Sequence, residues 1–306
     1  MDLEIESNKL EGNGAKQNIQ IGLWSALVSS AYLVLADYLL KHFSASWLLF
    51  TSLMILPLLL PAAWKNRKRY SSWRKLAWQS FALVGILSGS YNLAFLLSAD
   101  RLPISVAAMF LSVASVMVLP LTCLIAKRLP QRLELASITM VLIGVALVLQ
   151  LHAAEYSFLG MTFGLLATFL TANATIYSGK VRNVLVASEA MIAKQLGKLV
   201  FAVIGLTALI KEDFGPKDSE LYLWILLAMY GLMKIYDTFI ASRAQFLLPP
   251  LLFQSLSLLS LPIVCVVEIY LFKGTFSLWQ WAGVVAIILA GFLAARSKQT
   301  QLKAIQ

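Results

Sequence analysis

The sequence predicts an all-α membrane protein with ten transmembrane helices arranged as two inverted five-helix repeats. Three observations support this prediction: the composition of the chain, the division of its basic residues between the two membrane sides, and an internal similarity between its halves. Of the 306 residues, 59% are hydrophobic and 13% are charged, which is too little polar surface to cover a soluble domain. Lipid must therefore surround most of the chain.

Ten apolar stretches are each long enough to cross a bilayer, for which a helix needs about 20 mostly apolar residues. The expected spans are 21–41, 46–64, 76–98, 103–126, 131–151, 157–179, 189–210, 220–242, 249–272 and 277–295. The joints between them are short, so consecutive helices are expected to run antiparallel. No stretch remains for a separate soluble domain.

Basic residues gather in every second joint. With the amino terminus inside, the cytoplasmic segments hold most of the 25 lysines and arginines, including the run WKNRKRYSSWRK at 64–75. The longest joint on the opposite side, KEDFGPKDSE at 211–220, is acidic overall. This is the positive-inside distribution, and it places both termini in the cytoplasm.

The two ends of the chain are polar. Residues 1–20 are expected to form a disordered cytoplasmic tail without the features of a signal peptide, and residues 296–306 a second cytoplasmic tail. The compact chain without a targeting sequence favours the bacterial inner membrane.

Matching residues recur at an offset of 147 residues in the later helices of each half. Pro103 and Pro250 each stand at the start of a span, and Gly144 matches Gly291. The halves, at 21–151 and 157–295, hold five spans each, so the second copy enters the membrane from the opposite side. Inverted repeats of this kind are characteristic of secondary transporters.

The later part of each half also resembles a known family. The runs LPISVAAMFLSVASVMVLPLTCLIAKRLPQRLELASITMVLIGVALVL (102–149) and PPLLFQSLSLLSLPIVCVVEIYLFKGTFSLWQWAGVVAIILAGFLAA (249–295) are similar to the two repeats of the EamA-type drug/metabolite transporter superfamily. The second run keeps the family's mid-helix proline as Pro262, whereas the first has Ser115 there and Pro120 further along. The resemblance implies a transporter, not an enzyme, with helices 1, 3, 4, 6, 8 and 9 around a central cavity.

Polar residues inside a span are costly in lipid and therefore mark candidate sites. In the eighth span, Tyr230, Lys234 and Asp237 stand at i, i+4 and i+7, so they share one helix face. Either this face points to a polar substrate cavity, or Lys234 and Asp237 form a structural pair near the cytoplasmic end of the helix.

Two further spans carry candidates at helical spacing. Asn173 and Tyr177 in the sixth span could bind an anionic group while the ring stacks on the solute, or Asn173 could bond to a neighbouring helix. Lys194 and Lys198 share a face of the seventh span and need an anionic partner, which could be Glu189, a lipid phosphate or a substrate. We expect Lys194 to reach the membrane interface, which leaves Lys198 as the stronger candidate.

The remaining candidates come from the third, fourth and ninth spans of the expected cavity: Tyr91, Asn92, Ser112, Ser115, Gln254 and Ser255. Asp37 stands four residues before Lys41 near the outer surface, where the two form an expected interfacial pair. If Asp37 faces the cavity instead, it is the candidate for proton coupling, because a buried carboxylate can bind a proton near neutral pH.

No catalytic constellation, cofactor motif or metal-ligand spacing is found in the sequence, and Cys123 and Cys265 lie inside apolar runs. We expect a secondary transporter that exports a small polar metabolite, an amino acid or an organic anion, by alternating access. Two alternatives stay open: an exchanger of nucleotide sugars or nucleotides from the same superfamily, and a non-transporting membrane scaffold. The expected partners are the substrate and membrane lipids, without nucleic acid, and the glycine-bearing fifth and tenth spans could join two copies as a homodimer.

Overall fold

The computed structural model is built of helices joined by short segments. It describes residues 2–55, 61, 64, 75–125, 127–149, 157–181, 184–209, 220–248, 253, 256–272 and 277–305. The elements are α1 (Asp2–Leu40), α2 (Ala45–Phe50), the 3₁₀ helix η1 (Thr51–Ile55), α5 (Lys75–Ala99), α6 (Ile104–Ile125), α7 (Arg132–Leu149), α8 (Phe158–Lys180), α9 (Ala187–Leu209), α10 (Leu221–Leu247), α12 (Ser260–Phe272) and α13 (Leu278–Ile305). No strand occurs among these residues.

Five segments of the described helices are long and apolar enough to cross a membrane. They are Gln17–Leu40, Lys75–Ala99, Ile104–Ile125, Phe158–Lys180 and Leu221–Leu247, and Leu278–Leu293 is a shorter apolar helix. The predicted class, an all-α membrane protein, is confirmed. The count of ten spans stays a prediction.

Polar side chains at the helix starts fix several of the boundaries. At α13, Ser277 N donates to Gln280 Oε1 at 2.9 Å and Gln280 N donates back to Ser277 Oγ at 3.2 Å. At α9, Val186 N donates to Glu189 Oε2 at 2.9 Å. The pair at α13 is reciprocal, and the bonds at both helices satisfy backbone donors at the helix start that would otherwise be unpaired.

Four elements differ in extent from the sequence prediction. Residues 2–20, expected to be disordered, continue α1 as helix, and residues 296–305 continue α13. Both runs contain good helix formers, and a membrane helix supplies the nucleus from which they extend. The expected span 46–64 changes to a 3₁₀ helix after Phe50, and the span 249–272 is interrupted by a turn, so α12 begins only at Ser260.

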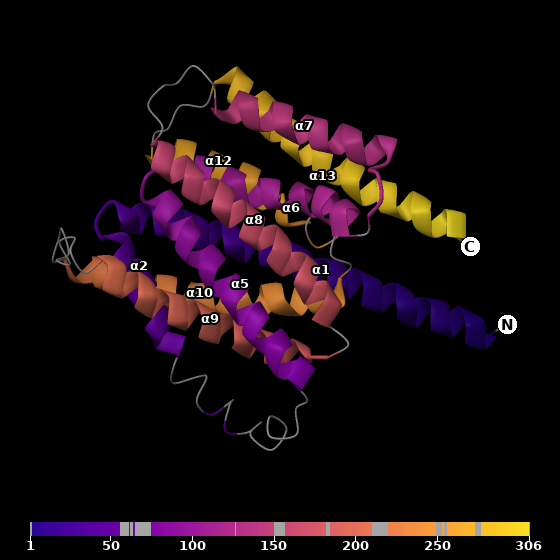
Figure 1. Cartoon of the computed structure of the whole chain (residues 1–306), viewed down its shortest axis with the longest axis horizontal. Helices are drawn as coiled ribbons and strands as arrows, with labels where there is room; N and C mark the ends of the chain where they lie inside the picture. Colours follow the sequence, from indigo (N-terminus) through magenta and orange to yellow (C-terminus); the bar gives the residue numbers. More distant parts are fainter. Residues whose placement is uncertain are drawn as a thin grey trace.

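The helices form one antiparallel bundle in which both chain ends lie at the same end (Figure 1). Pairs of helices from opposite halves pack against each other in matching ways. Contacts of α5 with α8 correspond to those of α10 with α1, and contacts of α6 with α8 correspond to those of α12 with α1. This pattern is expected for two halves of similar structure, because each helix then makes the contacts that its counterpart makes in the other half.

Glycines allow the closest of these crossings. On α7 and α13, a β-carbon added to Gly144 would lie 2.8 Å from Gly283 O, and one added to Gly283 would lie 2.6 Å from Gly144 O. The glycine faces of the expected fifth and tenth spans are therefore in contact within one chain. A homodimer remains a prediction and would need other surfaces.

A cluster of fully buried apolar side chains lies at the end of the bundle away from the termini. Leu39, Phe43, Leu48 and Leu96 are fully buried there. The ring centroid of Trp224 lies 5.3 Å from that of Phe43, in an edge-on arrangement. Side chains from both halves of the chain thus contribute to this apolar cluster.

Candidate functional site

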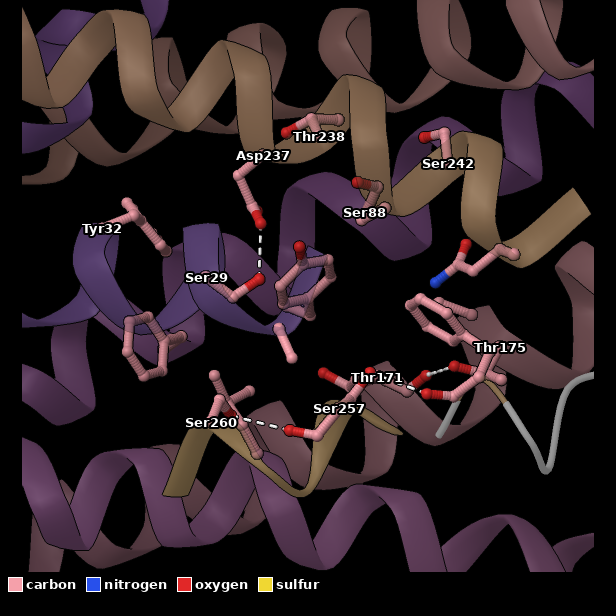
Figure 2. Close-up of a pocket in the computed structure, with 18 of the residues that line it drawn as sticks. Ser29, Tyr32, Ser88, Thr171, Thr175, Asp237, Thr238, Ser242, Ser257 and Ser260 are labelled. Atoms are coloured by element: carbon pink, nitrogen blue, oxygen red, sulfur yellow. Dashed lines mark hydrogen bonds between the residues drawn. The ribbon is translucent and has the colours of Figure 1, made fainter. Parts of the chain in front are cut away.

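A cavity of about 160 Å³ lies between α1, α5, α6, α8, α9, α10 and the segment that enters α12. Its polar lining is Ser29, Tyr32, Ser88, Tyr91, Ser112, Thr171, Thr175, Lys194, Asp237, Thr238, Ser242, Gln245, Ser257 and Ser260. Figure 2 shows several of these side chains converging on the same space from different helices. The sequence prediction that helices 1, 3, 4, 6, 8 and 9 meet around a cavity corresponds to this arrangement, with α9 as an addition.

One carboxylate lines the cavity among the described residues. Asp237 on α10 accepts a hydrogen bond from Ser29 Oγ on α1, with 2.5 Å between the two oxygen atoms. In Figure 2 the two side chains face each other across the space between these helices. A carboxylate has about four acceptor positions, so Asp237 can still accept hydrogen bonds from a solute.

A lysine lies toward the other end of the same lining. Lys194 on α9 is 8% exposed and donates a hydrogen bond to Gln245 Oε1 on α10. Its expected position at the membrane interface is wrong, because α10 extends to Leu247 and so brings Gln245 beside it. An ammonium group has three donors, so Lys194 also has capacity for a ligand.

Lys198 and Lys234 lie behind this lining and are each 4% exposed. Lys198 Nζ donates to Thr238 Oγ1 at 2.6 Å and lies 5.9 Å from the centre of the Tyr91 ring. Lys234 Nζ donates to Ser52 Oγ on η1 at 3.0 Å. Through Thr238 and Tyr91, the charge of Lys198 is coupled directly to residues that line the cavity.

The three lysines share an unusual electrostatic situation. In the part of the chain that the structure describes, none of their ammonium groups lies within 4.0 Å of a carboxylate, and all three bond to neutral side-chain oxygens. Buried charges without an ion-pair partner at that distance are costly, and within this site Asp237 acts electrostatically on Lys194 and Lys198 from further away.

Three of the lining hydroxyls also have unused hydrogen-bonding capacity. Ser88 Oγ, Thr171 Oγ1 and Ser242 Oγ are buried and have no hydrogen-bond partner among the described residues. Buried polar atoms are normally paired, so these hydroxyls are available to a bound solute or water.

The other predicted residues on α10 and α5 lie beside the cavity and not in its lining. Tyr230 is fully buried, and its ring is stacked on Tyr32 with 5.3 Å between the centroids. Asn92 is buried next to Tyr91, and its Nδ2 has no partner among the described residues. The i, i+4, i+7 spacing of Tyr230, Lys234 and Asp237 brings only Asp237 to the cavity surface.

Two candidates on α8 are turned away from the cavity. Asn173 Nδ2 donates to Phe169 O in the preceding turn at 2.8 Å, and Tyr177 OH donates to Ser80 Oγ on α5 at 3.4 Å. Asp37 forms the expected pair with Lys41, with 3.3 Å between the carboxylate and Nζ, and is absent from the lining. None of these three residues lines the cavity.

Ser112 lines the cavity and donates to Ala108 O at 3.0 Å. Ser115 belongs to α6, but its side chain lies outside the described residues, as do Gln254 and Ser255.

Sequence reasoning missed Ser29, Thr171, Thr175, Thr238, Ser242, Gln245, Ser257 and Ser260. Most are serines and threonines, which are unremarkable in membrane helices because they can bond to their own backbone. Thr175 Oγ1, for example, donates to Thr171 O at 3.0 Å. Ser29 could have been found from its spacing. It stands three residues before Tyr32, another polar residue of the same span, so the two share a helix face.

Part of the chain is similar to a known family of proteins. Residues 18–150 match the sequence profile of the EamA-like transporter family. A search of curated proteins gave no match. A crystal structure described only as that of a protein has a TM-score of 0.62 and 15% sequence identity to this chain, covering 94% of this chain and 99% of the other. At that identity the likeness shows the fold alone.

Proposed function

We propose, from the match of residues 18–150 to the EamA-like transporter family, that the chain is a secondary transporter of a small metabolite with an anionic group. The substrate is an amino acid or an organic anion, the mechanism is alternating access, and the direction is export. The halves 21–151 and 157–295 act as the two repeats that move against each other.

One observation carries the substrate assignment. Lys194 lines the cavity, and Lys198 and Lys234 are buried behind its lining, while Asp237 is the one carboxylate found in the described lining. Binding of an anion would bring opposite charge to these ammonium groups, and charge-assisted hydrogen bonds are about twice as strong as neutral ones. An uncharged solute would not offset the desolvation of the lysines.

The size of the cavity supports a small substrate. Its volume of about 160 Å³ is below the roughly 300–1,000 Å³ of pockets that hold drug-sized ligands. A nucleotide sugar is a larger ligand than this cavity favours, although Tyr32, Tyr91 and Phe95 could stack on a base. The volume thus favours an amino acid or organic anion over the nucleotide-sugar alternative.

The proposed membrane is the bacterial inner membrane, with both termini in the cytoplasm. The helix ends near Lys127, Lys180 and Arg243 lie at the same end of the bundle as the two termini (Figure 1). Cationic residues concentrate on the cytoplasmic side of membrane proteins.

The proposal is tested by a thermal-shift screen of the purified protein against amino acids, organic anions and nucleotide sugars, followed by flux assays in proteoliposomes. A ligand that binds the folded form raises its apparent stability. We expect anionic hits whose transport is lost in Lys198→Met and kept in Lys41→Met, where the lysine side chain is half exposed. Flux of an uncharged solute that Lys198→Met leaves unchanged would contradict the proposal, and so would the absence of flux for every compound.

A further inference from the structure

The cavity lining has two charged groups, the carboxylate of Asp237 on α10 and the ammonium group of Lys194 on α9, and they lie beside different turns of α10. Asp237 is held at one level by Ser29, and Gln245 holds Lys194 at the other. Ala241 and Ser242, which also line the cavity, lie between them on the same helix. In Figure 2, Asp237 and Ser29 lie on one side of the drawn pocket, and Ser242 and Thr175 lie toward the other.

The length of α10 between these levels sets the size of a solute that can reach both. Asp237 and Gln245 are eight residues apart in sequence, which corresponds to about 12 Å along an α-helix. A solute that hydrogen-bonds at both ends leaves roughly 3 Å for each hydrogen bond. Because the side chains of Asp237 and Gln245 extend from the same helix, we take this backbone rise as the spacing of the two levels. The charged groups of the solute would then be about 6 Å apart, slightly less than two residues of extended chain.

We infer that the cavity binds a solute with a carboxylate and an ammonium group about 6 Å apart, with the carboxylate at Lys194 and Gln245 and the ammonium group at Asp237 and Ser29. The inference rests on the proposed function, which it narrows to one substrate class. The α-ammonium and α-carboxylate of an amino acid are too close together to reach both levels. Solutes with the required separation are ω-amino acids, amino acids with a basic side chain, and dipeptides.

The middle of the cavity fits such a solute. Tyr32, Leu33, Leu111 and Phe95 give it apolar walls, which suit a methylene spacer. The unpaired hydroxyls of Ser88, Thr171 and Ser242 could instead bond to a peptide group, which would favour a dipeptide. The choice between spacer and peptide is left to experiment.

Calorimetric titration of the purified full-length protein tests the inference with three groups of probes. The first is the series of ω-amino carboxylates from glycine to 8-aminooctanoate, the second is the same acids without the amine, and the third is lysine and glycylglycine. We expect affinity to peak between 4-aminobutyrate and 6-aminohexanoate. At the peak, loss of the amine should weaken binding about tenfold or more, as for a hydrogen bond between charged groups.

Two variants assign the ends. Asp237→Asn should abolish the advantage of the amine and leave binding of the plain acids within about threefold. Lys194→Gln should weaken amino acids and plain acids alike. The melting temperature of each unliganded variant reports whether it is folded, and the length series on the unaltered protein decides the question if a variant is not.

The possible failures are distinguishable. If plain carboxylates bind as tightly as their amino counterparts, or if glycine binds as tightly as 5-aminopentanoate, the inference is overturned while transport of an anion stands. If no carboxylate of any length binds, the proposed function fails with it.

Discussion

The crossing of α5 and α9 gives a sharp prediction about stability. Gly85 and Gly197 bring the two backbones together, and a β-carbon at position 197 would overlap Gly85 O. Since nonbonded heavy atoms need roughly 3.5 Å between them, Gly197→Ala must push the helices about 1.5 Å apart. Backbone cannot rotate aside as a side chain can, so the full displacement falls on the helix pair.

The size of the effect follows from two opposing contributions. Forcing an extra methyl group into a packed interior costs about 1–3 kcal/mol, and a backbone-to-backbone overlap belongs at the upper limit. Replacing glycine by alanine within a helix returns about 1 kcal/mol. We therefore expect Gly197→Ala to lower the free energy of unfolding by about 2 kcal/mol.

Gly205→Ala is the matched control, because it lies on the same helix. A β-carbon there would meet Leu49 Cδ1 at 2.8 Å and Leu93 Cδ1 at 2.9 Å, both at the ends of flexible side chains. This variant should lie between no change and a gain of about 1 kcal/mol. Unfolding in mixed detergent micelles measures both values, and equal stability of the two variants would refute the reasoning from helix contact.

Three further predictions concern other parts of the bundle. Asp37→Asn should leave transport unchanged and alter stability by less than about 1 kcal/mol, because Asp37 pairs with a lysine that is half exposed; loss of pH-dependent flux in this variant would restore Asp37 as the coupling residue. Ser137→Ala removes the buried 2.7 Å hydrogen bond from Ser137 Oγ to Ala290 O between α7 and α13. The free energy of unfolding should fall by about 1 kcal/mol while transport is retained. Unaltered stability would show that this bond contributes nothing. Membrane-impermeant labelling of a tag at either terminus should reach both tags only after the inner membrane is opened, and labelling of one tag in intact cells would contradict the proposed topology.

The sequence predicted where most helices lie more accurately than how they are rotated. Hydrophobic runs and caps place α5, α6 and α8 within one or two residues of their expected ends. The direction in which a side chain points is a different matter, because both the lipid face and the packed interior of a membrane helix are apolar. Asn173 and Tyr177 have the same spacing as Tyr230 and Lys234, yet none of these four lines the cavity.

The contact between Lys194 and Gln245 could not be predicted from hydropathy. α10 continues to Leu247, five residues beyond its expected end, and this extra turn presents Gln245 to Lys194. A lysine one or two turns from a helix end can extend to the interface or turn inward to a partner on another helix. Only the packing of α9 against α10 decides between these conformations.

The different packing at the two ends of the bundle bears on how the proposed transporter would work. Away from the termini, Phe43, Leu48 and Leu96 are fully buried. Toward the termini, Lys194 and Gln245 line the cavity near the ends of their helices. A substrate would therefore enter from the side proposed as cytoplasmic, and its release on the far side requires the cluster around Phe43 to separate. Because the contacts between the halves come in matching pairs, an exchange of conformations between the repeats could open that cluster while closing the cavity near Lys194.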